Sequence, residues 1–252
     1  MGRKFINYKT PMPQFYCKRL GYELEGGFSE DIAEYNNDED RYYGDYFKED
    51  GSVSCDSYLE GEIASPVFFC DELGFKNMSS FIKSNMPLEV NDSCGHHIHV
   101  SFNNLLAYQK LMDLPFRSAF RNAVMHYFRH DNLIMNDGDL LKRFERRIKG
   151  IEYCYNMWSP NAQANPSCMY NFDGNDNGRY TQLNFAFETH GTLECRLFPA
   201  SDNADIVINI NRWFVNFVNE YLNHLTYERT PYDNMNIDKN HNEKIEDKVF
   251  CV

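Results

Sequence analysis

Apolar and polar residues alternate along several short segments of the chain, which is the pattern of strands with one buried face. Gly and Asn-rich turns separate some of these segments and favour antiparallel hairpins. The candidate strands are residues 18–28, 51–57, 61–69 and 95–102, followed by a hairpin of residues 179–188 and 192–198 after a turn at residues 173–178.

A second pattern, with apolar residues three and four positions apart, predicts amphipathic helices. Pro115 suits the first turn of one of them, because proline lacks the amide hydrogen that is unpaired there anyway. Strands followed by helices in this order indicate an α+β fold, with a mostly antiparallel sheet and helices gathered to one side. The predicted helices are residues 73–84, 104–113, 115–130, 140–155 and 204–225.

No internal repeat and no linker divides the body of the chain, so residues 1–225 are expected to form one domain. Residues 226–252 are polar and charged, and we expect them to be a tail. Residues 29–40 are rich in Asn, Asp and Glu, and we interpret them as an exposed excursion beside the first strand.

Composition narrows the function classes. A formal charge of -12 argues against general nucleic-acid binding and against anionic membranes, which require a basic face. The eight cysteines contain no CxxC pair, which favours free thiols in a reducing cytoplasm. No signal peptide precedes the first strand, and no apolar run approaches the ~20 residues that span a bilayer.

Ionisable residues occur in pairs at a spacing of two within three predicted strands. Side chains at this spacing lie on the same face, so the pairs predict one polar surface on the sheet. Each pair also has an ordinary interpretation, as a solvated face, as structural histidines or as a salt bridge. The pairs are Glu23 with Glu25, His97 with His99, and Glu194 with Arg196.

These side chains allow two kinds of metal chemistry. Two histidines and a glutamate could hold Zn²⁺ for hydrolysis. Several carboxylates beside a single histidine instead suit Mg²⁺, which prefers oxygen ligands and is completed by substrate phosphates. Arg196 could neutralise a transferring phosphoryl group. The sequence has no GxxxxGK[ST] loop, which excludes a P-loop nucleotide site.

An ordered set of motifs resembles the amidoligase family of the glutamine synthetase-like carboxylate–amine ligase superfamily, which is commonly met in phages and bacteria. The resemblance implies a curved antiparallel sheet that forms half a barrel, with helices packed on its convex side. The motifs are GYELE at residues 21–25, DGSV at 50–53, EIASP at 62–66, CGHHIHV at 94–100, RYTQLN at 179–184 and TLECRLF at 192–198.

The resemblance also implies roles for individual residues around ATP and Mg²⁺, for which Mn²⁺ could substitute. One metal would lie between the β- and γ-phosphates, and a second on the side of the acyl acceptor. Arg196 and Arg179 would be the catalytic cations. Metal ligands would be Glu23, His97 and Glu194 for the first ion and Glu25 and Glu62 for the second, with His99, Ser52, Arg196 and Arg179 around the nucleotide.

By this resemblance, residues 1–225 are an amidoligase catalytic domain that joins a carboxylate to an amine through an acyl phosphate. The substrates would be small molecules or peptides, and the location the cytoplasm, of the host if a phage encodes the chain. Asp50, Asp56 and Glu60 are further candidates for the second metal. The alternatives are a zinc-dependent hydrolase that uses His97 and His99, and a non-catalytic accessory binding protein on the same fold.

Overall fold

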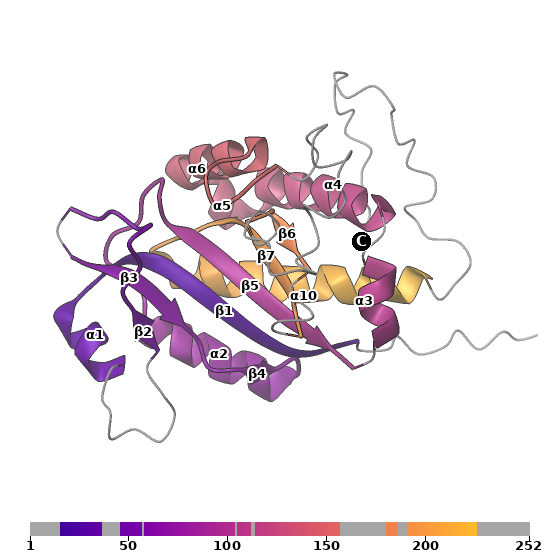
Figure 1. The fold of residues 1–252 in the computed structure, drawn as a ribbon, viewed down its shortest axis with the longest axis horizontal. Coiled ribbons are helices and arrows are strands. Elements are labelled where there is room, and N and C mark those ends of the chain that lie inside the picture. The colour runs from indigo at the N-terminus through magenta and orange to yellow at the C-terminus, as the bar shows by residue number, and fades with distance from the viewer. Residues whose placement is uncertain are drawn as a thin grey trace, which may run out of the picture.

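The computed structural model describes the chain from Tyr16 to Leu225 with several gaps. Its centre is an open antiparallel sheet in which β1 and β5 lie side by side (Figure 1). The described residues are 16–36, 46–56, 58–103, 105–111, 114–156, 180–185 and 191–225.

The strands run in the order β2-β3-β1-β5-β7-β6, and β4 pairs with the early part of β1 on the same edge as β3. Every pair of named strands is antiparallel. The strands are β1 (Cys17–Phe28), β2 (Phe47–Lys48), β3 (Leu59–Ala64), β4 (Phe68–Phe69), β5 (Gly95–Phe102), β6 (Leu183–Asn184) and β7 (Leu193–Pro199).

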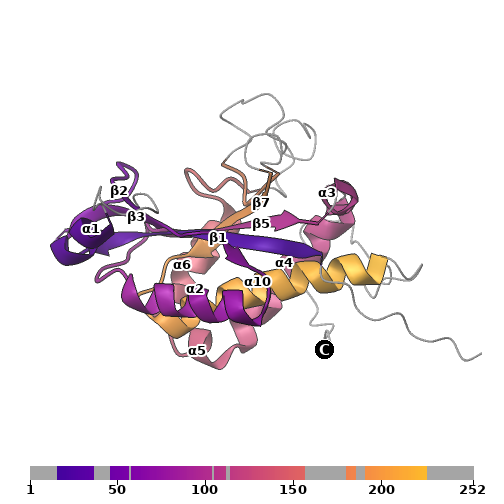
Figure 2. The same cartoon turned by 90° about the horizontal axis from the view of Figure 1, so that it is seen from below.

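Helices cover one side of this sheet. Viewed along its edge, α2, α4, α5, α6 and α10 lie on the same side, while α1 and α3 lie at its two ends (Figure 2). The helices are α1 (Glu30–Asn36), α2 (Glu72–Ser84), α3 (Leu105–Leu111), α4 (Leu114–His130), α5 (Asn132–Met135), α6 (Gly138–Lys149) and α10 (Ala204–Leu225).

The hydrophobic core lies between the sheet and these helices. Every second residue of β1 points into it, and Leu20, Tyr22 and Leu24 are at most 2% exposed. Ile98 and Val100 of β5 are fully buried on the same face. The alternation of the sequence therefore assigns one face of each central strand to the core and leaves the other face for polar side chains.

The last helix fixes the start of the first strand. The side-chain oxygen of Asn219 accepts hydrogen bonds from the backbone amides of Tyr16 and Cys17, at 2.8 and 2.9 Å. Asn219 is 4% exposed, so this amide pairs two backbone donors that would otherwise be buried without a partner. The two ends of the described chain are thereby joined across the interface between the sheet and the helices.

The strongest sequence patterns predicted their elements well. The strand expected at residues 18–28 is β1, that at 95–102 is β5, and the final helix is α10. The predicted hairpin is present as β6 and β7, which pair antiparallel, although β6 spans only two residues. The turn at 173–178 and the tail at 226–252 lie outside the described residues.

The strand predicted at residues 51–57 is wrong for the described residues 51–56. Asp50 instead begins a turn there: its side chain accepts from the amide of Ser52 at 2.8 Å, and its carbonyl accepts from the amide of Val53 at 3.1 Å. A side chain that bonds to the backbone two residues on favours a turn over an extended ladder. The strand of this region, β2, precedes the turn.

Three other boundaries differ from prediction. The helix expected over residues 140–155 ends at Lys149, because Gly150 adopts a φ of 95° that continues no right-handed helix. The strand expected over 61–69 is interrupted around Pro66 and becomes β3 and β4. Residues 29–40 are not simply an exposed excursion, because α1 forms there and buries Ala33.

Among the described helices, none combines the length and the apolar character that crossing a bilayer requires.

Truncating the buried side chain of Leu24 tests whether the alternation of β1 specifies the core. Leu24→Ala should lower the free energy of unfolding by about 2–5 kcal/mol, because it removes a fully packed side chain. Leu73→Ala is the control, since Leu73 is 66% exposed. Urea denaturation followed by circular dichroism measures both variants, and equal midpoints would contradict the assigned faces.

Candidate functional site

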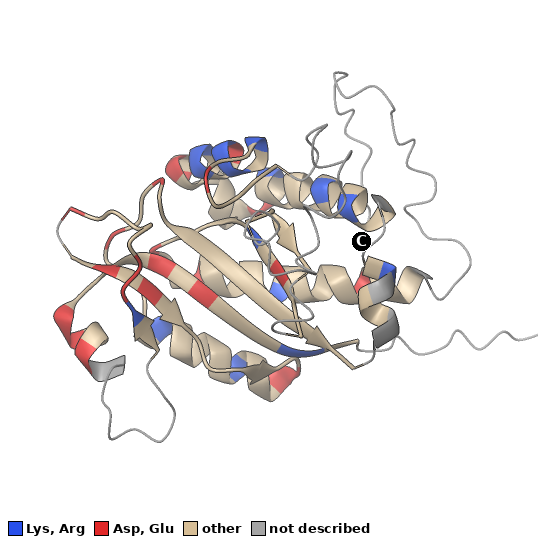
Figure 3. Cartoon of the chain, in the orientation of Figure 1, with Lys and Arg blue, Asp and Glu red and all other residues tan. Residues whose placement is uncertain are grey.

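Polar side chains form a continuous row across the open face of the sheet. The register places Glu25 opposite Glu62 on β3 and Glu23 opposite His97 on β5. His99 in turn lies opposite Glu194 on β7. Figure 3 shows acidic positions where β1 and β3 run side by side, whereas α4 carries basic ones and α6 carries both.

A first cluster of three possible ligands lies at the centre of this row. Ligand atoms of Glu23, His97 and Glu194 all fall within 4.8 Å of one another. His97 is held between two carboxylates, with Nδ1 3.1 Å from Glu23 Oε2 and Nε2 3.4 Å from Glu25 Oε1. Its side chain is only 4% exposed, so its ring is fixed. A histidine oriented by carboxylates in this way is typical of metal sites.

Electrostatics hold the first cluster in a charged state. Burial alone would raise the pKa of Glu23, but hydrogen bonds and positive charge from His97 and His99 lower it below its usual range. Burial would lower the pKa of His99, but its interaction with the Glu23 carboxylate and the charge of Glu194 raise it instead. His99 Nε2 lies 3.6 Å from Glu23 Oε1 and 3.9 Å from Glu194 Oε1, within ion-pair distance of both carboxylates.

Arg196 neutralises one end of the first cluster. Its Nη1 lies 2.5 Å from Glu194 Oε1, and the side chain of Asn184 donates to the other carboxylate oxygen at 2.7 Å. Burial would raise the pKa of Glu194, but the charges of Arg196 and His99 keep it below its usual range. Glu194 is therefore ionised and fixed on both oxygens.

A second cluster lies on the β3 side of the first. Ligand atoms of Glu25, Asp50 and Glu62 fall within 4.8 Å of one another. Burial, with the negative charge of Glu23, Glu25 and Asp50, raises the pKa of Glu62 to about 7. Lys48 is the only cation that the described residues place within ion-pair distance of Glu62, and its Nζ is 3.9 Å away. This cluster carries more negative charge than its protein surroundings neutralise.

Both clusters have the composition of divalent-cation sites. Each offers carboxylate oxygens at mutual distances that one ion could bridge, and the donor set of the second cluster is entirely oxygen. The raised pKa of Glu62 is what a cation at the second cluster would relieve, because a positive charge there favours the ionised carboxylate. Mg²⁺ or Mn²⁺ fits this donor set better than Zn²⁺ does.

His96 points into the core, as the alternation of β5 requires. It is fully buried, and its Nε2 lies 3.1 Å from the side-chain nitrogen of Asn211 on α10. Burial and the nearby charge of His97 lower the pKa of His96 to about 3, so it stays neutral. It belongs to the packing between sheet and helices.

The structure separates some of the predicted site residues. Ser52 lies at the exposed turn after Asp50, beside the second cluster. Asp56 and Glu60 are exposed near it, and Glu60 accepts a hydrogen bond from the amide of Cys55 at 2.9 Å. Of the three candidates for the second cluster, only Asp50 joins it. Arg179 lies outside the described residues.

Arg147 on α6 lies beside the site, which no motif in the sequence predicts. Its side chain is buried, and Nη1 donates to the carbonyl of Arg196 at 3.1 Å. A Cβ on Gly95 would lie 2.7 Å from His97 Nε2 and 2.8 Å from Arg147 Nη2. Because residue 95 is glycine, the buried guanidinium group of Arg147 can approach the first cluster. The spacing of basic residues along a helix does not predict this approach.

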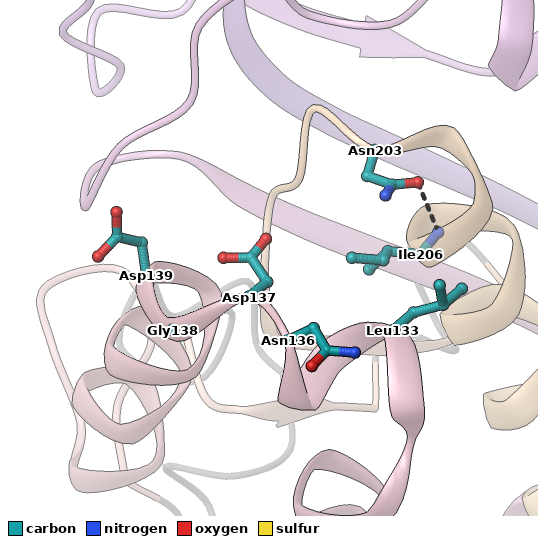
Figure 4. Close-up of a pocket in the computed structure, with 7 residues that line it drawn as sticks. All are labelled: Leu133, Asn136, Asp137, Gly138, Asp139, Asn203 and Ile206. Carbon is teal, nitrogen blue, oxygen red and sulfur yellow. Dashed lines mark hydrogen bonds between the residues drawn. The ribbon is translucent and has the colours of Figure 1, made fainter.

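A separate hollow of about 500 Å³ lies among α5, the first turn of α6 and the start of α10 (Figure 4). Asp137 and Asp139 line it, and Asp137 is engaged in capping α6 through the amide of Leu140 at 2.9 Å. It is on the helix side of the sheet, away from both ligand clusters. No basic residue is among those that line it.

The comparisons identify the class of this chain. The family model described as "Putative amidoligase enzyme" matches residues 38–218, most of the sequence, so the chain belongs to this family of ligases. The match includes Glu62, His97, Glu194 and Arg196, whereas β1 with Glu23 and Glu25 precedes it. The comparison with curated proteins and the comparison with solved structures gave no match.

Neutralising Glu62 should stabilise the metal-free protein at alkaline pH. The pKa of Glu62 in the folded protein, about 7, exceeds the usual value of ~4.3. The folded protein therefore loses stability as pH rises between these two values, because Glu62 ionises less readily there than in the unfolded chain. Glu62→Gln removes this loss, by about 3 kcal/mol at pH 8 and little at pH 4.

Urea denaturation in EDTA at the two pH values measures this difference. Glu220→Gln on exposed α10 surface is the matched control and should show no such pH-dependent gain. A Glu62→Gln variant that is no more stable than the wild type at pH 8 would contradict the proximity of the three carboxylates.

Proposed function

We propose that this amidoligase-family chain is an ATP- and Mg²⁺-dependent ligase that joins a carboxylate to an amine through an acyl phosphate. The observation that carries the proposal is the pair of adjacent ligand clusters on one sheet face, with Arg196 at one end. Two neighbouring cation sites beside an arginine suit a triphosphate and a second substrate. The open antiparallel sheet with one covered face is consistent with a glutamine synthetase-like half barrel.

Each cluster has a different role in this proposal. Glu23, His97 and Glu194 would hold the cation between the β- and γ-phosphates, and Glu25, Glu62 and Asp50 the cation on the acceptor side. Bound Mg²⁺ would supply charge neutralisation on the phosphate oxygens. His99, whose pKa is raised by Glu23 and Glu194, would face the nucleotide between these two carboxylates.

The chain itself would position and neutralise. A substrate carboxylate would attack the γ-phosphorus of ATP, forming an acyl phosphate and releasing ADP. Arg196 would offset the charge on the equatorial oxygens, and buried Arg147 would add a second positive charge behind the first cluster. An amine would then attack the acyl carbon, expel phosphate and leave an amide. The buried, fixed side chains favour this role because they need little reorganisation.

Two residues outside the clusters, Arg179 and Ser52, would also contribute to the site. Arg179 would be a further cation at the nucleotide. Because Ser52 lies in the turn after Asp50, it would approach a substrate from that turn and not from the β7 side. The substrates would be small-molecule or peptide carboxylates and amines, and the protein would act in the cytoplasm.

Removing a ligand of the first cluster tests the proposal. Glu23→Gln and His97→Asn should each weaken the binding of Mn²⁺ with a non-hydrolysable ATP analogue by at least about 100-fold. Isothermal titration calorimetry measures this, with Glu220→Gln as the control.

Metal analysis of the purified protein separates the alternatives. One tightly bound zinc without nucleotide binding would favour a hydrolase and contradict the ligase.

An amine and carboxylate screen with ADP release as the readout then tests turnover. Turnover that responds to one pair of substrates is expected. Nucleotide binding with no response to any mixture would favour a non-catalytic binding protein.

A further inference from the structure

Three tyrosines from two distant segments gather beside the first ligand cluster. The rings of Tyr153 and Tyr155 both contact that of Tyr180 edge-on, with centroids 5.1 and 6.1 Å apart. Backbone hydrogen bonds fix the two segments together, from Tyr155 to the carbonyl of Tyr180 at 2.6 Å and from Gln182 to the carbonyl of Tyr155 at 3.2 Å. Tyr153 and Tyr155 are nevertheless each 42% exposed.

The backbone is strained where it presents the first of these rings. Tyr153 has a φ of 61°, and it is the only residue other than glycine with a positive φ in the described chain. The turn is closed by reciprocal hydrogen bonds between Ile151 and Cys154, both at 3.1 Å. A bulky side chain rarely adopts this left-handed conformation, and such strain gathers at functional sites.

Arg196 connects this aromatic wall to the first cluster. One guanidinium group bonds to Glu194, donates from Nε to the carbonyl of Tyr153 at 3.1 Å, and lies 5.6 Å from the centre of the Tyr180 ring. The guanidinium group of Arg196 therefore lies between this aromatic wall and the cluster assigned to the phosphates. A ligand that fits both has a flat ring at one end and a polyphosphate at the other.

We propose that Tyr153 and Tyr155, which Tyr180 holds in place, form the base-binding wall of the site and stack against the purine of a nucleoside triphosphate. This inference rests on the proposed function, because the phosphates are placed by the ligand cluster. Tyr153 and Tyr155 both present exposed ring surface, and an aromatic face suits a base. The nucleotide then enters from the β6 and β7 side and leaves Glu25, Asp50 and Glu62 to the second substrate.

The test compares ligands that share the phosphates but differ in the base. Calorimetry with Mn²⁺ measures the affinities of ATP and of inorganic tripolyphosphate for the full chain. A Tyr153→Ala, Tyr155→Ala double variant should bind ATP about tenfold to a hundredfold more weakly and tripolyphosphate unchanged. The matched Tyr153→Phe, Tyr155→Phe variant should keep ATP affinity within about twofold, since stacking needs the ring and not the hydroxyl.

The outcomes separate this inference from the proposed function. If the wild type binds neither ATP nor tripolyphosphate, the phosphate site itself is wrong and the wall falls with it. If the wild type binds both and the alanine variant keeps its ATP affinity, the wall is not a base site while the phosphate site stands. Equal losses for ATP and tripolyphosphate in the alanine variant would also overturn the inference, because they indicate damage to the cluster and not loss of stacking.

Discussion

The register between β1 and β5 determines which side chains of this molecule meet. With Glu23 opposite His97 and Tyr22 opposite Ile98, one face of the pair is charged and the other apolar. A slip of one residue would exchange the faces, placing carboxylates against the helices and aromatic rings in the open site. The hydrophobic core therefore fixes the register and with it the position of the ligand clusters, so stability and chemistry depend on one alignment.

The two clusters differ in how their negative charge is balanced. The first contains positive charge of its own, because His99 and Arg196 lie beside Glu23 and Glu194. The second has little beyond distant Lys48, and the raised pKa of Glu62 records the imbalance. A site of the first kind is organised before a ligand arrives, whereas one of the second kind is repulsive until a cation enters. This asymmetry suits an ordered filling, in which the first cluster is already organised and the second forms when a cation enters.

Much of this arrangement could be predicted, because strand alternation is a local property of the sequence. The pairs at spacing two predicted that Glu23, His97 and Glu194 lie on one polar surface of the sheet, and the family resemblance implied that they share one metal. Arg147 could not be found in that way, since its place beside His97 depends on how α6 packs and on the missing side chain of Gly95. The turn at Asp50 was missed because a side-chain hydrogen bond overrode an extended pattern. The position of Tyr153 could not be predicted either, because it depends on a positive φ that tyrosine does not favour.

The bond between Asn219 and the start of β1 has a consequence for synthesis of the chain. About 200 residues separate the partners, which a ribosome adds in roughly 10 to 40 s. During that time β1 can pair with β3 and β5, but α10 has not yet been made to cover their apolar face. The nascent sheet is then exposed to aggregation, and chaperones that shield apolar surfaces would act on this intermediate. α10 can cover its part of this apolar face only after the last helix has been made.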